Sequence, residues 1–155
     1  MATWNEFVAE APQLAEAIEA RLKAHKHHLL ATLRRDGSPR ISGTEVEFFE
    51  GQLVIGSMLN ALKVRDISRD PRYALHANPG HHSMEGGDAK VSGRAREVHG
   101  EEKDRIVANY EHDPGEAHFV VLDIDEAVLT TVDEAREHLN IDLWRPGAEV
   151  QRFFK

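Results

Sequence analysis

Cysteine is absent from the sequence, and this absence excludes disulfide bonds, thiolate metal sites and cysteine nucleophiles. Long apolar runs are also missing, since none approaches the roughly 18 residues that a membrane-spanning helix needs. The N-terminal stretch carries Glu6, Glu10, Glu16 and Glu19, which do not suit the apolar core of a signal peptide. We therefore expect a cytoplasmic protein that does not enter a membrane.

Basic residues are in the minority, with 19 Lys and Arg against 27 Asp and Glu, so the formal net charge is −8. This balance argues against nucleic-acid binding, which generally uses a basic surface. The 155 residues fit one domain, and their 41% apolar content is enough for a packed core. We expect a single domain over residues 1–155, with a helical segment over 1–25 and a barrel over 26–155.

Helical periodicity is confined to the N-terminal part of the chain. Thr3-Trp4-Asn5-Glu6 has the form of a capping box, which predicts a short helix from Trp4. Leu14, Ile18 and Leu22 recur every four residues after Pro12, which predicts an amphipathic helix over about residues 12–24.

Short strands separated by turns dominate the rest of the chain. Asp36-Gly37 lies between two strand-like runs, which is typical of a β-hairpin. A bend near Asp125-Glu126 can join two of the later runs into one long strand. Their number and spacing favour a β-barrel or a sandwich. We predict strands over about 29–33, 40–48, 53–55, 73–75, 90–98, 119–122, 128–132, 139–143 and 150–154, and short helices over 61–68 and 101–110.

One stretch of the acidic chain is nearly neutral. Residues 34–72 hold six acidic residues, and such an island favours an anionic ligand, with a surface of ordinary mixed charge as the alternative. The seven basic residues of this stretch are Arg34, Arg35, Arg40, Lys63, Arg65, Arg69 and Arg72.

The segment Gly56–Lys63 has the pattern of a strand end, a polar loop and a helix start. A cation such as Lys63 in the first turn of a helix opposes the helix dipole, whereas a bound anion would reverse that penalty and accept the free N–H groups. Ser57 and Asn60 could add hydrogen bonds. The segment therefore predicts a phosphate site, with an ordinary surface lysine as the alternative.

Two further features break the pattern of their strands. Ser42 and Gly43 weaken the strand that begins at Arg40, and glycine within a strand marks either close approach by a ligand or a bulge. Trp144 falls on the wetter face of its strand, away from Leu143, which predicts a dimer or ligand contact, with local packing as the alternative.

No other catalytic motif stands out. The histidines cluster at His25–His28 and His81-His82 without the spacing of a zinc site, so we expect no metal. There is no Gly-x-Ser-x-Gly motif, and Asp123–Glu126 has the character of a strand bend rather than a carboxylate pair for hydrolysis.

Four segments in order along the chain resemble the pyridoxamine 5′-phosphate oxidase-like, FMN-binding split-barrel superfamily. His28–Arg40 resembles its opening hairpin, and Leu62–Arg72 resembles its lysine-bearing helix with the strand entry that follows. Asp88–Ala95 resembles a later strand, and Leu143–Gly147 is similar to the C-terminal tryptophan segment.

The resemblance implies a mainly β fold with flanking helices, a six-stranded antiparallel split β-barrel, and a homodimer with two flavin-type cofactors between the subunits. It implies that Arg40–Thr44 lines the isoalloxazine and ribityl chain, that Gly56–Lys63 holds the phosphate, and that Trp144 approaches the flavin from the partner subunit. The cofactor-binding residues implied are Arg40, Ile41, Ser42, Gly43, Thr44, Gly56, Ser57, Met58, Asn60, Lys63 and Trp144.

The chain departs from the family pattern in two places. Ala61-Leu62 stands where many members have Ser-Arg ahead of the lysine, so the phosphate site has one charge and one hydroxyl fewer. The C-terminal segment Ala148–Phe154 lacks the basic, histidine-containing substrate motif, so pyridoxal phosphate synthesis is not expected. The strand Ser42–Phe48 is similar to an actinobacterial branch in which many members use the deazaflavin coenzyme F-420, so FMN and F-420 both stay open as cofactors.

The leading hypothesis is a flavin- or deazaflavin-dependent oxidoreductase that transfers a hydride between the cofactor and a small organic substrate. No side chain is singled out as a catalytic acid or base. Two alternatives stay open: a non-catalytic protein that binds or carries flavin, deazaflavin or haem, and a dimeric scaffold with a degenerate cofactor cleft.

Overall fold

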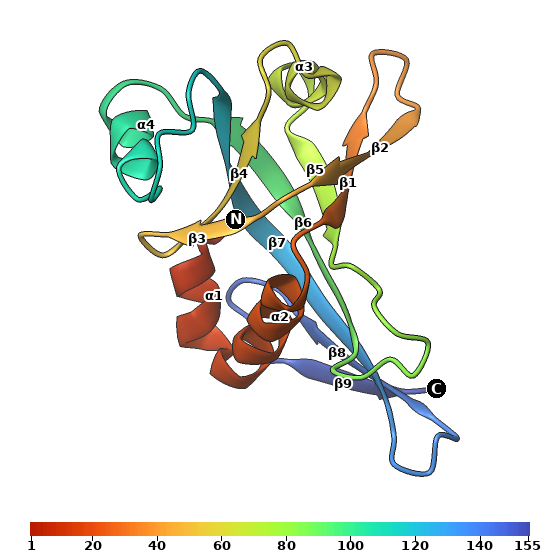
Figure 1. Ribbon diagram of the computed structural model, residues 1–155. Helices are drawn as coiled ribbons and strands as arrows, with labels where there is room; N and C mark the ends of the chain where they lie inside the picture. The colour runs from red at the N-terminus through yellow and green to blue at the C-terminus, as the bar shows by residue number, and fades with distance from the viewer.

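The computed structural model describes all residues, 1–155, and arranges four helices around one antiparallel sheet of nine strands (Figure 1). The mainly β composition with flanking helices is confirmed, but the sheet has nine strands rather than the six expected. None of the helices combines the length and the apolar character needed to span a bilayer. The elements are α1 (Trp4–Glu10), α2 (Pro12–Ala24), β1 (His28–Leu33), β2 (Pro39–Thr44), β3 (Glu47–Phe49), β4 (Gln52–Ser57), α3 (Leu62–Arg69), β5 (Arg72–His76), β6 (Asp88–Glu97), α4 (Gly100–Val107), β7 (His118–Val132), β8 (Leu139–Trp144) and β9 (Gln151–Phe154).

The sheet is ordered β2-β1-β5-β6-β7-β4-β3, and β8 extends it by pairing with β7 and with β9. Strand β7, with 15 residues, pairs with β4 through its first part and with β8 through its last part. No ladder of hydrogen bonds joins β2 to β3 or β4, so the sheet is not closed. An open antiparallel sheet of this kind is consistent with a split barrel.

The predicted bend in the long strand is confirmed. Ser92 pairs with Glu126 and Gly93 pairs with Ile124, so Asp125 is the extra residue of a β-bulge. A Cβ atom at Gly93 would lie 2.1 Å from the carbonyl oxygen of Asp123. Only glycine therefore fits at this crossing of the two strands.

The N-terminal helices form as the sequence predicts. In α1 the N–H of Glu6 donates to the Thr3 hydroxyl at 3.2 Å, and the N–H of Thr3 donates back to the Glu6 carboxylate at 2.7 Å, which completes the capping box. Helix α2 begins at Pro12. Proline has no backbone N–H, which costs nothing here because N–H groups in the first turn of a helix have no partner within the helix.

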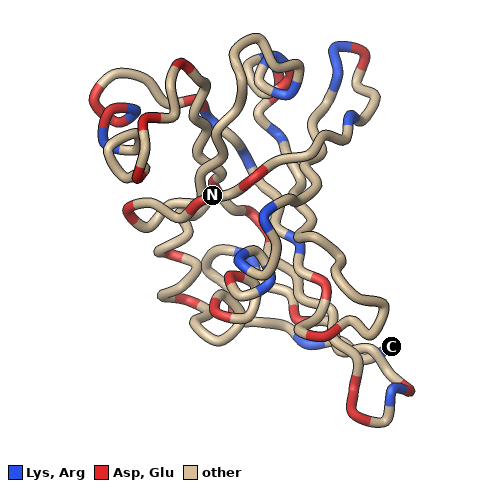
Figure 2. Tube along the Cα trace, viewed as in Figure 1, with Lys and Arg blue, Asp and Glu red and all other residues tan.

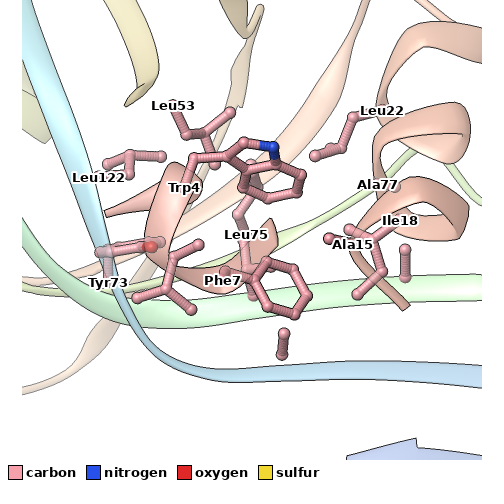
Figure 3. Close-up of a cluster of buried hydrophobic side chains, with 14 of the residues drawn as sticks. Trp4, Phe7, Ala15, Ile18, Leu22, Leu53, Tyr73, Leu75, Ala77 and Leu122 are labelled. Carbon is pink, nitrogen blue, oxygen red and sulfur yellow. The ribbon is translucent and has the colours of Figure 1, made fainter. Parts of the chain in front are cut away.

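Helices α1 and α2 cover one face of the sheet and form most of the core with it (Figures 1 and 3). Figure 3 shows Trp4 and Phe7 of α1 beside Ile18 of α2, with Leu75 and Leu122 from the sheet. Burying a large apolar side chain contributes about 1.5–3 kcal/mol. The helical segment is therefore an integral part of the fold.

His28, the first residue of β1, is buried, with 2% of its surface exposed. The backbone N–H of Asn78 donates to its Nδ1 at 2.9 Å, so Nε2 carries the proton and donates to the carbonyl oxygen of Leu22 at 2.8 Å. Protonation of Nδ1 would break the hydrogen bond from the N–H of Asn78 and place two donors against each other. Burial, the largest cause, lowers the pKa of His28.

We expect the free energy of unfolding to decrease as the pH is lowered below about 6.5, which is the pKa of His28 in the unfolded chain. In that range the unfolded chain binds a proton at His28 and the native chain does not. This loss continues as pH falls toward the depressed native pKa. The measurement is urea unfolding between pH 8 and pH 5 for the wild type and His28→Gln. The variant should show a shallower fall, whereas His112→Gln, at an exposed histidine, should keep the wild-type slope. Equal slopes for wild type and His28→Gln would contradict the assignment.

Candidate functional site

A groove of about 610 Å³ lies between β2 and β4, which are not hydrogen-bonded to each other, and reaches the N-terminus of α3. We call it the seam groove because it follows the unclosed part of the sheet. Its volume lies within the range of about 300–1,000 Å³ typical of cofactor and ligand sites. The lining residues are His27, Gly43, Thr44, Glu45, Glu47, Gly56, Ser57, Met58, Ala61, Lys63, Tyr110, Pro114, Glu116, Ala117 and Phe119.

Each wall of the seam groove contains a glycine, Gly43 in β2 and Gly56 in β4. Strand β2 pairs with β1 in unbroken register, so the alternative of a bulge at Gly43 is wrong. A Cβ atom at Gly43 would meet nothing within 4 Å, whereas one at Gly56 would lie 3.5 Å from the hydroxyl oxygen of Tyr110. The wall at Gly43 therefore leaves backbone accessible to a ligand, as a close approach requires.

The N-terminus of α3 carries unsatisfied backbone donors at the end of the groove. Ala61 is the N-cap residue, no side chain caps the helix, and the first turn has no acidic residue. The side chain of Asn60, which precedes the N-cap residue, does not cap the helix. Uncapped N–H groups and the helix dipole favour an anion at this place.

Lys63 bridges the two walls of the groove. Its ammonium group, which comes from α3 beside β4, donates to the carbonyl oxygen of Gly43 in β2 at 2.8 Å. The side chain is half-buried, and burial lowers the pKa of Lys63. Part of the charge of Lys63 is thus already desolvated, and the alternative of an ordinary surface lysine stays open beside the phosphate site.

The groove is lined by side chains of both charges, with carboxylates in the majority. Lys63 is the only lysine or arginine among its lining residues, while Glu45, Glu47 and Glu116 supply carboxylates. Burial first, and then Glu47 and Glu45, raise the pKa of Tyr110. Figure 2 shows basic segments on α3 and at the β1–β2 turn within an acidic chain. An anionic group therefore fits only at the α3 end of the groove.

The structure brings together about half of the residues predicted to bind a cofactor. Thr44 is buried at the end of β2, and Met58 is exposed just after β4. The predicted residues that line the seam groove are Gly43, Thr44, Gly56, Ser57, Met58 and Lys63, and those that lie outside it are Arg40, Ile41, Ser42, Asn60 and Trp144.

Arg40 is held away from the groove by the buried carboxylate of Asp66. Its Nε donates to Asp66 at 2.7 Å, and the same carboxylate accepts from Thr32 at 2.7 Å and from Arg69 at 3.0 Å. Burial alone would raise the pKa of Asp66, but the hydrogen bonds from Arg40, Thr32 and Arg69 outweigh it, so the pKa is lowered. Asp66 therefore fastens α3 to β1 through Thr32 and to β2 through Arg40.

Ile41 and Ser42 point to opposite sides of β2, because side chains alternate along a strand. Ile41 is 72% exposed and lines a second groove, of about 450 Å³, on the outer face of the sheet. The hydroxyl of Ser42 is buried on the inner side without a hydrogen-bond partner. Asn60 contributes its backbone N–H to His118 rather than a side chain to the groove.

The prediction that Trp144 lies on a wetter face is wrong, because its side chain is fully buried. Its ring lies 4.5 Å from that of Phe7, and its Nε1–H donates to the Glu10 carboxylate at 3.2 Å. The same carboxylate accepts the N–H of Gly147 at 2.8 Å. Local packing under the turn at Pro146-Gly147 is thus the correct alternative, and Trp144 is a core residue.

Sequence reasoning missed the wall of the groove that follows α4. Tyr110, Pro114, Glu116 and Phe119 lie far along the chain from Lys63, and no local motif connects them to it. The pairing of Gly56 with Phe119 across β4 and β7 brings them to the groove. No group of three or more His, Asp or Glu is placed to hold a metal ion.

Comparison with known proteins agrees with this architecture. The sequence profile described as pyridoxamine 5′-phosphate oxidase matches residues 14–134. PhzG from Burkholderia lata 383, solved with tetrahydrophenazine-1-carboxylic acid, is similar with a TM-score of 0.68 at 14% identity, covering 93% of this chain and 88% of that one. In sequence alone, none of the curated proteins matches the chain.

Two further solved structures share the fold. A pyridoxamine 5′-phosphate oxidase-related, FMN-binding protein from Nostoc punctiforme PCC 73102 has a TM-score of 0.68 at 13% identity, over 94% of this chain and 95% of that one. A haem-binding protein from Mycobacterium smegmatis has a TM-score of 0.52 at 20% identity, over 88% of this chain and 57% of that one.

We expect Asp66→Ala to lower the free energy of unfolding by about 3 kcal/mol, because it leaves Arg40 and Arg69 without their shared partner beneath α3. Urea unfolding measures the change. The control is Asp70→Ala, which removes a partly exposed carboxylate that pairs with the exposed Arg72, and its effect should be much smaller. Similar losses in the two variants would show that the Asp66 cluster does not fasten α3.

Proposed function

The chain belongs to the pyridoxamine 5′-phosphate oxidase family, and from that membership we propose that it binds FMN or the deazaflavin coenzyme F-420 in the seam groove and acts as an oxidoreductase on a small organic substrate. The profile match confirms the resemblance drawn from the four sequence segments. The observation that carries the proposal is the bridge from Lys63 to Gly43 at the uncapped end of α3.

The groove fits a cofactor of this class in several respects. The backbone at Gly43 is open, and the hydroxyl of Ser57 is buried at the groove without a hydrogen-bond partner. The ammonium group of Lys63 and the free N–H groups of α3 suit a phosphate. Leu62, at the position where the family resemblance implies an arginine in many members, is 52% exposed and offers no charge.

The roles of the residues follow from their places in the groove. Lys63 and the first turn of α3 would hold the phosphate, and the β2 backbone at Gly43 and Thr44 would lie along the rest of the cofactor. When bound, a flavin-type cofactor supplies the hydride chemistry, so the protein needs to bind and orient it rather than to provide an acid or base. Phe119 and Tyr110 would keep water from one side of the groove.

We also propose that the chain forms a homodimer through the outer face of the sheet. The groove of about 450 Å³ on that face is lined mainly by apolar residues, among them Leu29, Ile41 and Val128. Leu29 is 44% exposed and Ile41 is 72% exposed. Contiguous exposed apolar surface of this kind is typical of an interaction site.

The first experiment is a parallel titration of the purified protein with FMN, F-420 and haem, followed by cofactor absorbance and tryptophan fluorescence. Selective micromolar binding of FMN or F-420 supports the proposal and identifies the hydride donor with which to screen substrates. Selective binding of haem favours a haem-binding protein instead. Binding of FMN or F-420 that no electron donor reduces favours the carrier function, and binding of none favours the scaffold.

We expect Lys63→Ala to weaken the binding of the selected phosphate-bearing cofactor by about 10- to 100-fold, because a charge-assisted hydrogen bond contributes about 1.5–3 kcal/mol. Isothermal titration calorimetry measures the dissociation constant. The control is Arg65→Ala, which removes an equal charge from an exposed position of the same helix and should change binding little. If both variants lose affinity equally, the effect of Lys63 is one of overall charge and the phosphate site lies elsewhere.

We expect Ile41→Lys to shift the protein from dimer to monomer, because the charge would be desolvated in an apolar interface. Sedimentation equilibrium measures the change. Phe154→Ser is a matched control, since Phe154 is 71% exposed but lies on β9, away from the groove of Ile41. A wild-type monomer, or a variant that stays a dimer, would refute the proposed interface.

A further inference from the structure

His118 lies directly beside the loop that leads from β4 to α3. It is the first residue of β7 and pairs with Ser57, the last residue of β4. Its Nδ1 contacts the carboxylate of Glu97 at the end of β6. The backbone N–H of Asn60 donates to its Nε2 at 3.4 Å. A chain of contacts therefore runs from β6 through one imidazole to the loop.

The loop has a conformation that needs support. Residues Met58–Ala61 form a turn in which the N–H of Ala61 donates to the carbonyl oxygen of Met58 at 3.2 Å. Asn60 has a φ of 65°, in the left-handed region that asparagine tolerates better than most residues. His118 accepts the backbone N–H of Asn60 itself. The contact therefore supports the turn at the residue with the left-handed backbone conformation.

The two nitrogens of His118 have different tasks. Nε2 can accept the N–H of Asn60 only when it carries no proton, so the proton of the neutral ring lies on Nδ1. The carboxylate of Glu97 lies in ion-pair contact with Nδ1, and its negative charge there favours this tautomer and this orientation of the ring. The second oxygen of Glu97 contacts Nε2 of His99 at 3.0 Å, but His99 is exposed and has no contact with the loop.

We propose that Glu97 and His118 are a positioning pair that holds the turn Met58–Ala61, so that the free N–H groups of α3 and the ammonium group of Lys63 face the phosphate of the cofactor. This inference rests on the proposed function, because it concerns the phosphate end of the same groove. His118 acts through the turn and does not line the groove itself. Because Ala61 and Leu62 have no side-chain donors, the proposed phosphate site depends on the backbone N–H groups that the pair holds in place.

The experiment compares the affinities of FMN and riboflavin, which differ only in the phosphate, for the wild type and for variants of His118. His118→Ala should weaken FMN binding by about tenfold and leave riboflavin binding unchanged, because the fold and the rest of the groove are intact. His118→Gln should restore most of the FMN affinity, since its amide oxygen can reach the place of Nε2 and accept the N–H of Asn60. Glu97→Ala should resemble His118→Ala, whereas His99→Ala should resemble the wild type.

Each outcome decides the question. A fall in the ratio of riboflavin to FMN dissociation constants in His118→Ala, with rescue by His118→Gln, supports the positioning pair. An equal loss of both ligands shows that His118 serves the fold alone and overturns the inference, as does an unchanged FMN affinity; the proposed function stands in both cases. If the wild type binds FMN no better than riboflavin, the loop is not a phosphate site, and the inference and the FMN form of the proposed function fail together. If it binds neither flavin, the FMN form fails, and an F-420 affinity that His118→Ala leaves unchanged overturns the inference.

Discussion

The long strand β7 is the constraint on which the rest of the structure depends. Its first residues pair with β4, its last residues pair with β8, and β6 accompanies it through both regions. One straight strand could not serve both regions, and the bulge at Asp125 turns it between them. That bulge requires a glycine at position 93, because any side chain there would collide with the backbone of Asp123. The absence of a side chain at Gly93 thus allows one strand, β7, to pair with β4 at one end and with β8 at the other.

The open seam of the sheet follows from the same arrangement. Strand β2 lies at one end of the strand order, and β4 lies next to the other end. The two do not pair, yet Lys63 donates across the gap to Gly43. Asp66, one turn further along α3, holds the helix to β1 and β2 through Thr32 and Arg40. Helix α3 therefore spans the seam and presents its N-terminus to the seam groove.

Local sequence predicted the elements whose causes are local. The capping box at Thr3, the proline at the start of α2 and the Asp36-Gly37 turn each act within a few residues, and each is found in the structure. The α3 segment was also recognisable, because a glycine, a polar loop and a first-turn lysine follow one another in the chain. These features need no knowledge of the tertiary structure.

Features that depend on distant partners could not be predicted in this way. The alternation around Leu143 places Trp144 on the opposite face of β8, but only the fold shows that α1 covers that face through Phe7 and Glu10. Arg40 stands in the right strand for a cofactor contact, yet Asp66, 26 residues away, takes its charge. His118 contacts Glu97 on one side and Asn60 on the other only because β6, β7 and β4 are neighbours in the sheet.

These distant contacts decide how the charge of the groove is used. With Arg40 neutralised by Asp66 and with leucine at position 62, Lys63 is the only lysine or arginine left to face an anionic group. One ammonium group among several carboxylates cannot attract a phosphate from a distance. In the proposed phosphate site, short-range geometry would therefore have to supply the affinity, through backbone donors that are already held in place. The less charge a site offers, the more its binding depends on the residues that fix its backbone.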